Sequence, residues 1–97
     1  MVYAQANSAD VFHYRDETAL EVDAVIVADD GRWMGVEFKL GDTQVDAAAR
    51  SLKSLSRKMV AMGEQPPAAL VVVTGHDNFA HRRKDGVVVV PVDVLGP

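Results

Sequence analysis

Apolar and polar positions alternate over the first third of the chain, as they do in β-strands. Residues 10–15, Asp-Val-Phe-His-Tyr-Arg, are rich in aromatic and β-branched types and predict a first strand. Residues 20–28 and 32–40 predict two more strands, separated by a short polar turn. The last of these alternates with a period of two, so it has two distinct faces. One face carries Met34, Val36, Phe38 and Leu40, and the other carries Trp33, Gly35, Glu37 and Lys39.

The middle of the chain has the spacing of an amphipathic helix. Its apolar residues recur three and four positions apart, at Val45, Ala48, Leu52, Leu55, Met59 and Met62. Thr43 followed by Asp46 approximates a capping box, with Asp in place of the usual Glu. Gly63 is typical of the position just beyond a helix end, and Pro66-Pro67 cannot continue a helix. The pattern therefore predicts one long helix between Thr43 and Gly63.

Apolar runs return after the helix. Residues 68–74 predict a buried strand parallel to its neighbour, and residues 75–86 predict a polar loop. Residues 87–95 predict the last strand, in which Pro91 indicates a sheet edge or a bulge. Residues 1–9 show no apolar stripe and are expected to form a frayed arm or a short helix. The predicted fold class is α/β, a mixed β-sheet with one long helix in the order β-β-β-α-β-β.

Size and composition narrow the class of protein. With 97 residues, 48% of them hydrophobic, the chain is expected to fold as one domain around its own core. The absence of cysteine excludes disulfides and thiolate metal sites, and a reducing cytoplasm is the simplest setting. No apolar run reaches the roughly 18 residues that would span a membrane. The net charge of −4 argues against a general polyanion binder, although a local basic patch is compatible with it.

The turn between the second and third strands predicts their register. Asp29-Asp30-Gly31 suits a type I turn followed by glycine in the left-handed region, which would pair Ala28 with Arg32. The facing pairs are then Glu21 with Lys39, Val22 with Phe38, Asp23 with Glu37, Ala24 with Val36 and Ile26 with Met34. A slip by one residue would mix charged and apolar side chains on both faces. This register therefore predicts a cluster of four charged side chains on one face of the hairpin.

The facing carboxylates of Asp23 and Glu37 would repel each other unless a cation lies between them or nearby. Lys39 or a divalent cation could fill that role, and Mg²⁺ is commonly held by one or two carboxylates together with water and phosphate oxygens. Lys39 could then orient or activate a water molecule, or stabilise charge on a phosphate. An exposed cross-strand salt-bridge cluster, worth ~0.2–1 kcal/mol per pair, explains the same residues without any catalysis.

Other charged and aromatic residues also have two interpretations. The run His81-Arg82-Arg83-Lys84 could contact phosphates or could be a solvated loop. The basic residues off the helix stripe are expected to be ordinary solvated side chains; they are Arg50, Lys53, Arg57 and Lys58. Trp33 could stack on a base, or it could cover the sheet or fill a partner interface.

Several of these motifs, in this order, resemble a known family. They are His13-Tyr14-Arg15, Glu21-Val22-Asp23, Val36-Glu37-Phe38-Lys39, and a final strand Asp85-Gly86-Val87-Val88-Val89-Val90-Pro91-Val92. Together they resemble the C-terminal domain of unknown function that follows the ATPase module in many prokaryotic AAA-type ATPases. That domain belongs to the PD-(D/E)XK, or restriction-endonuclease-like, superfamily. The resemblance runs from about Val11 to Leu95.

The resemblance implies roles for individual residues. Asp23 and Glu37 would be ligands of Mg²⁺ or Mn²⁺, and Lys39 would be the catalytic lysine. Glu21 is an accessory candidate from the predicted register, and Arg15 is one because it falls on the family's tyrosine-arginine motif. The superfamily core usually opens with a helix before its first strand, but only ten residues precede Val11 here and none of them is Glu.

We therefore expect residues 1–97 to be a single nuclease-like domain, either a fragment or C-terminal module of a larger protein or a minimal version of the fold. The expected function is metal-dependent cleavage of nucleic-acid phosphodiesters in association with an ATPase module. The alternative is a non-catalytic interaction or regulatory domain that retains the fold. Without the opening helix one sheet face would lack cover, so a homo-oligomer is a further expectation.

Overall fold

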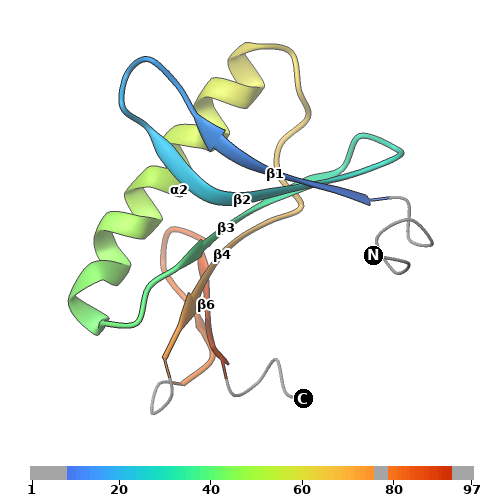
Figure 1. Ribbon diagram of the computed structural model, residues 1–97. Helices are drawn as coiled ribbons and strands as arrows, with labels where there is room; N and C mark the ends of the chain where they lie inside the picture. Colours follow the sequence, from blue (N-terminus) through green and yellow to red (C-terminus); the bar gives the residue numbers. More distant parts are fainter. Residues whose placement is uncertain (1–8, 76–78, 93–97) are drawn as a thin grey trace.

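The computed structural model describes residues 9–75 and 79–92, which form one mixed sheet with a single α-helix against it (Figure 1). The elements are β1 (Ala9–Arg15), β2 (Glu21–Ala28), β3 (Trp33–Phe38), a 3-10 turn η1 (Asp42–Gln44), α2 (Val45–Ala61), β4 (Ala69–Thr74), β5 (His81–Arg82) and β6 (Val88–Pro91). The sheet order is β1-β2-β3-β4-β6-β5. Of residues 1–9, on which an arm or short helix was expected, Ala9 begins β1 instead, and residues 1–8 lie outside the described part of the chain.

The sheet changes from antiparallel to parallel at β3. Strands β1, β2 and β3 form an antiparallel meander, whereas β3–β4 and β4–β6 are parallel pairs. The helix α2 is the crossover that the parallel β3–β4 pair requires. The predicted mixed sheet with one long helix is therefore confirmed, as is the parallel direction of the strand that follows the helix.

The loop predicted over residues 75–86 contains a sixth strand. The two-residue β5 pairs antiparallel with the start of β6, through His81 with Val89 and Arg82 with Val88. Pro91 lies beyond these pairs and faces Thr74 of β4, so its missing N–H removes no β5 bond. The polar sequence of the loop hid this strand because two residues are too few to show a period.

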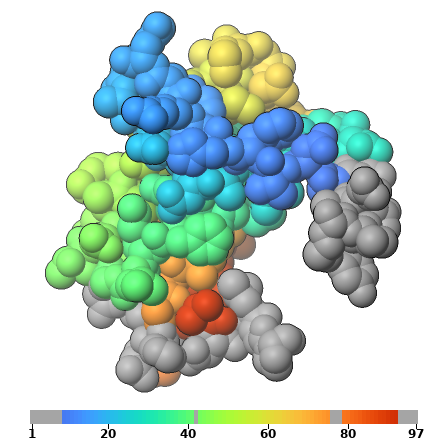
Figure 2. All heavy atoms as spheres, viewed as in Figure 1, coloured from blue at the N-terminus to red at the C-terminus, as the bar shows by residue number. Residues whose placement is uncertain are grey.

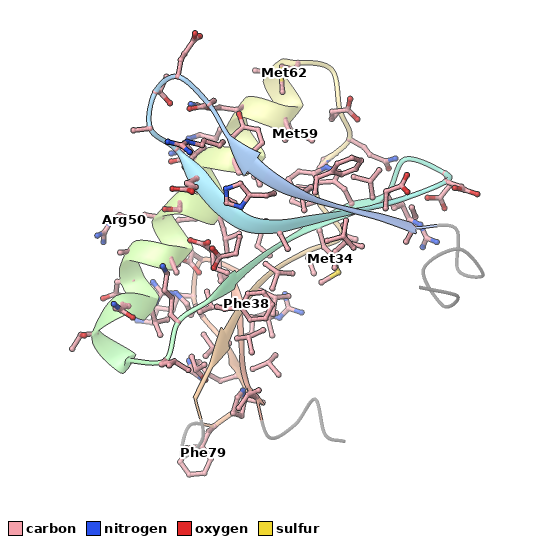
Figure 3. The ribbon with its side chains drawn as sticks, in the orientation of Figure 1. Met34, Phe38, Arg50, Met59, Met62 and Phe79 are labelled. Atoms are coloured by element: carbon pink, nitrogen blue, oxygen red, sulfur yellow. The ribbon has the colours of Figure 1, made fainter. Side chains whose placement is uncertain are left out.

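The two ends of α2 agree with the sequence to different degrees. At the start the predicted capping box is wrong, because Gln44 is the N-cap and no side chain makes a capping hydrogen bond. At the end Gly63 has φ +95, and the N–H of Glu64 donates to the carbonyl of Met59, as in a Schellman motif. Met62 is 64% exposed rather than buried, because it is the C-cap and no longer lies over the sheet (Figure 3).

The helix packs directly on β3. Ala48, Ala49, Leu52 and Leu55 are fully buried on it. A Cβ added at Gly35 would lie 3.0 Å from Leu52 Cδ2 and 3.4 Å from Leu55 Cδ2, so any larger residue would push these leucine side chains back. Because side chains alternate, Gly35 marks the face that also carries Trp33 and Glu37.

Trp33 is part of this core and is 2% exposed. Its indole N–H donates to the carbonyl of Gln65 at 2.8 Å. The interpretation of Trp33 as a base-stacking or partner-facing residue is therefore wrong, and its role is to cover the sheet. The other face of the sheet carries no described helix, and Val11, Phe38 and Leu40 are 63%, 55% and 84% exposed. The space-filling view shows the green end of β3 at the surface (Figure 2).

The predicted hairpin register is confirmed over its first half. The N–H of Ala28 donates to the carbonyl of Arg32 at 2.8 Å, and Gly31 has φ +90. The cross-strand pairs run from Val27–Trp33 to Ala24–Val36 and end there.

The pair predicted between Val22 and Phe38 is wrong. On the other side of β2, Phe12 pairs with Val25 and Tyr14 with Val22, so β2 holds one more residue than β1 between these pairs. This irregularity is a bulge, which reverses the side chains that follow it. Val22 therefore lies in the helix-side core at 0% exposure, whereas Phe38 is exposed.

A partly exposed ion pair connects the β1–β2 turn to the end of α2. The Lys58 ammonium donates to Asp16 Oδ2 at 2.6 Å, and the Tyr14 hydroxyl donates to the same oxygen at 2.9 Å. The Thr18 hydroxyl donates to Asp16 Oδ1 at 2.6 Å. Lys58 and then Thr18 hold the pKa of Asp16 far below its ordinary value of 3.8. Lys58, expected to be a solvated helix residue, is thus a structural contact.

We expect Asp16→Asn to lower the thermal unfolding midpoint at pH 7. A depressed carboxyl pKa contributes stability above its unfolded value near 3.8, and that contribution is lost as pH falls further. The difference between wild type and variant should therefore be full at neutral pH and shrink below pH 4. The neighbouring exposed Glu17→Gln is the control, and a Glu17 variant as destabilised as the Asp16 variant would contradict the role of the ion pair.

Candidate functional site

Asp23 and Glu37 meet where β2 and β3 separate. The ladder between the strands ends at Ala24–Val36, and each carboxylate then bonds to the other strand's backbone. The Asp23 N–H donates to Glu37 Oε1 at 2.9 Å, and the Phe38 N–H donates to Asp23 Oδ2 at 2.9 Å. The two carboxylates thus take the place of main-chain carbonyls at the point where the strands diverge. The predicted juxtaposition of Asp23 and Glu37 is present in the structure.

The two carboxylates have different surroundings. Glu37 is 4% exposed on the helix-facing side of β3, whereas Asp23 is exposed to solvent. Burial raises the pKa of Glu37, and the Asp23 carboxylate adds to the rise, while the Asp23 N–H and the Lys39 ammonium oppose it. A buried carboxylate beside another carboxylate is costly when ionised, so the pair favours a proton or a cation.

Lys39 lies one step beyond β3 on the same face. Its backbone N–H donates to the carbonyl of Val73 at 2.8 Å, which continues the β3–β4 ladder. Its half-buried side chain is near enough to lower the pKa of Glu37. Within residues 9–75 and 79–92 its ammonium has no hydrogen bond or ion pair. Lys39 therefore lies on the same face as Glu37, and its charge acts on the Glu37 carboxyl that meets Asp23.

Glu21 and Arg15 are not part of this group. Glu21 pairs with Arg15 across the β1–β2 ladder, and its Oε2 lies 3.1 Å from His13 Nε2. The predicted facing of Glu21 with Lys39 is wrong, because the bulge in β2 ends the register that would have produced it. The exposed Arg15 lies at the same edge of the sheet as Glu21, on β1.

Some of the basic side chains serve to hold the fold together. Arg83 donates to Asp46 at 2.6 Å and to Asp85 at 3.3 Å, and Lys53 contacts Asp85 at 3.2 Å. These contacts tie the β5–β6 turn to α2. Arg83 is therefore not a free phosphate contact, whereas Arg50 remains exposed and points away from α2 (Figure 3).

Thr74 is a residue of this region that the sequence did not single out. It is the last residue of β4, is 1% exposed, and its hydroxyl has no hydrogen-bond partner in the described part of the chain. A threonine that ends an apolar run carries no sequence signal of its own, because threonine is common in strands. Its position relative to Lys39 becomes apparent only once β3 and β4 are aligned.

The donor set suits a hard cation held by few protein ligands. Glu37 Oε1 and Asp23 Oδ2 each accept a backbone N–H, and no described N–H donates to the second oxygen of either carboxyl. The two carboxyls are close enough to share a proton, which contributes to the raised pKa of Glu37. No group of three or more His, Cys, Asp or Glu side chains in the described ranges could hold a metal ion. Mg²⁺ fits such a site, since it commonly binds one or two carboxylates and completes its shell with water and phosphate oxygens.

Comparison with known proteins places most of the chain in a family. Residues 1–95 match the model of a family described as Domain of unknown function (DUF4143). No curated protein and no solved structure matches the chain. In the part of the chain that the structure describes, no helix has the length and apolar character needed to cross a membrane.

Glu37→Gln should stabilise the metal-free protein at neutral pH. The raised pKa means that ionised Glu37 destabilises the folded state, by on the order of 1 kcal/mol per pKa unit. The amide oxygen can still accept the Asp23 N–H. The gain should be largest above the raised pKa and disappear below about 4.5, where wild-type Glu37 is protonated in both states.

Thermal unfolding in the presence of a chelator, followed from pH 4 to pH 8, measures this effect. The exposed Glu64→Gln removes the same charge elsewhere and controls for net charge. A Glu37 variant that is less stable than wild type at pH 8 would show that the carboxylate is not under electrostatic strain.

Proposed function

The chain belongs to the DUF4143 family, whose description names no activity, and we propose from the site that this domain is a metal-dependent phosphodiesterase acting on nucleic acid. One observation carries the proposal: the Asp23 N–H holds the Glu37 carboxylate and the Phe38 N–H holds the Asp23 carboxylate at the same place, where the charge of Lys39 also acts on Glu37. Membership of the PD-(D/E)XK superfamily, a cytoplasmic setting and association with an ATPase module are parts of the same proposal. The order and spacing of the motifs support the superfamily and the ATPase association, and the absence of cysteine supports the cytoplasmic setting.

In this proposal Asp23 and Glu37 hold Mg²⁺ or Mn²⁺ through the oxygens to which no described N–H donates. When bound, the cation supplies polarisation of the phosphate and a lowered pKa for coordinated water. Asp23 also accepts the Phe38 N–H, so its carboxylate is fixed in orientation before any ligand arrives. Glu37 is oriented in the same way by the Asp23 N–H.

Lys39 contributes positive charge at the place where a phosphate would approach. Its ammonium would stabilise charge that develops on the phosphate oxygens, as preorganised donors do in phosphoryl transfer. The burial of Glu37 has a second consequence. A proton and a cation compete for the Glu37 carboxylate, so metal affinity should rise as pH increases through its raised pKa.

Isothermal titration with Mn²⁺ on wild type and Asp23→Asn tests the metal site. Loss of supporting residues around a metal commonly lowers affinity by about 10- to 100-fold, so loss of a ligand should lower it at least about tenfold. Asp10→Asn, an exposed carboxylate on β1, is the matched control and should bind as wild type does. Absence of Mn²⁺ binding by the wild type, or equal binding by the Asp23 variant, would refute the proposal.

A nicking assay on supercoiled DNA separates binding from catalysis. Lys39→Ala should retain Mn²⁺ binding and lose nicking, because the ammonium acts on the phosphate and not on the cation. Full nicking activity in the Lys39 variant would show that the lysine has no catalytic role.

A second candidate function is a non-catalytic interaction domain, favoured by the sheet face that lacks a described helix. Phe38, Leu40 and Val11 are large apolar residues exposed on or beside that face. Exposed apolar surface of this kind is typical of sites where another protein binds. The candidate partners are a second copy of the chain and the ATPase module.

If two copies associate through this face, the molar mass measured by light scattering should rise with concentration toward that of a dimer. Phe38→Gln should then shift the protein toward the monomer. Phe79→Gln, an 85% exposed phenylalanine at the far tip of the molecule, is the control and should leave the mass unchanged (Figure 3). A monomeric wild type at all concentrations would exclude self-association.

A further inference from the structure

Thr74 is a buried polar residue on a face of the sheet whose other buried residues are mostly apolar. Buried polar groups almost always have a hydrogen-bond partner, and the exceptions call for a physical reason. The Thr74 hydroxyl is completely enclosed, yet it has no partner in the described ranges. Of the buried side chains that the structure describes, this is the one whose polar atom is left without a bond.

The neighbours of Thr74 on its face of the sheet are nearly all apolar. Val72 precedes it by two residues on β4, and Pro91 faces it on β6, where it offers neither an N–H nor a polar side chain. The residues of α2 that are buried against this side of the sheet are alanine and leucine. None of these residues can satisfy the hydroxyl through its side chain.

The neighbour on the other side is Lys39. Glu37 pairs with Val72 and Phe38 with Val73, and the Lys39 N–H donates to the carbonyl of Val73. Lys39 is therefore the next residue of the ladder and stands beside Thr74 on the same face. Adjacent strands lie roughly 4.8 Å apart, which is within reach of a lysine side chain.

Glu37 is a less suitable partner for this hydroxyl. Its Oε1 accepts the Asp23 N–H, so its carboxylate is directed toward β2 and away from β4. Lys39 has three N–H donors on a flexible stem, and its ammonium makes no bond to the described residues. Among the described residues, a donor without an acceptor thus stands beside an oxygen without a partner.

We propose that Thr74 is a positioning residue for Lys39. Its hydroxyl oxygen accepts a hydrogen bond from the Lys39 ammonium when the lysine stem turns inward, and this bond keeps the ammonium beside Glu37 instead of free in solvent. The catalytic role of this bond rests on the proposed function, because a fixed ammonium would stabilise a phosphate bound at the Asp23–Glu37 pair. The contact itself does not depend on any activity.

The ammonium groups of lysine can be observed directly by NMR after selective ¹⁵N labelling of lysine side chains. The sequence contains four lysines, which provide internal standards. Lys53 and Lys58 are in ion pairs, whereas Lys84 is exposed. The Lys39 signal, assigned by its loss in Lys39→Arg, should show slow proton exchange and restricted motion like that of Lys58.

Thr74→Val replaces the hydroxyl with a methyl group of similar size, so the fold should be retained. The Lys39 signal should then exchange and move like that of Lys84, while Lys53 and Lys58 are unchanged. Thr74→Ser keeps the hydroxyl and should keep the wild-type Lys39 signal. In the nicking assay the valine variant should lose roughly tenfold in rate, as loss of a hydrogen bond to a charged group commonly does, with unchanged Mn²⁺ affinity.

A Lys39 signal that is the same in wild type and Thr74→Val would overturn the inference, and so would a wild-type Lys39 as mobile as Lys84. The outcome is independent of the proposed function. If the signal depends on Thr74 but the wild type binds no Mn²⁺, the contact stands and the phosphodiesterase proposal fails. If the wild type binds Mn²⁺ and the Lys39 signal is unchanged in Thr74→Val, the phosphodiesterase proposal stands and the inference about Thr74 fails.

Discussion

The central constraint in this domain is that β3 has different partners along its length. Residues 33–36 of β3 pair with β2 in an antiparallel ladder. Residues 34–38 pair with β4 in a parallel ladder, which continues beyond the point where β2 has diverged. Divergence leaves backbone N–H groups of Asp23 and Phe38 without strand partners. Carboxylate oxygens of Glu37 and Asp23 accept them. The acidic residues are therefore part of how the sheet is held at its branch point, before any ligand is considered.

This arrangement connects stability with chemistry. The two N–H bonds to carboxyl oxygens satisfy backbone donors that would otherwise lack a partner at the branch point. The same geometry places a buried carboxylate beside a second one, and burial raises the pKa of Glu37. The site is complete in its backbone bonds, yet its buried carboxyl is disfavoured in the ionised form. The structural and the catalytic interpretations of Asp23 and Glu37 are thus compatible.

The helix and the ion pairs fix where the branch point lies. Gly35 lets the leucine side chains of α2 come so close to β3 that an added Cβ would be in tight contact with them. Asp16 with Lys58, and Arg83 with Asp46, attach the two outer turns to the ends of the same helix. The helix covers one face of the sheet, while apolar residues such as Phe38 remain exposed on the other. No helix among the described residues covers that second face.

The sequence by itself determined the elements that depend on local rules. Period-two alternation showed β3, three-and-four spacing showed α2, and Gly31 set the hairpin register that brings Asp23 to Glu37. It could not show the bulge in β2, because nothing in the residues near Val22 marks an extra position, and so Glu21 was placed wrongly. Only the tertiary structure decided that Trp33 and Glu37 face the helix, since alternation separates two faces without saying which one is covered. It also decided that Thr74 stands beside Lys39, because residues so far apart in the chain become neighbours only when β3 and β4 align.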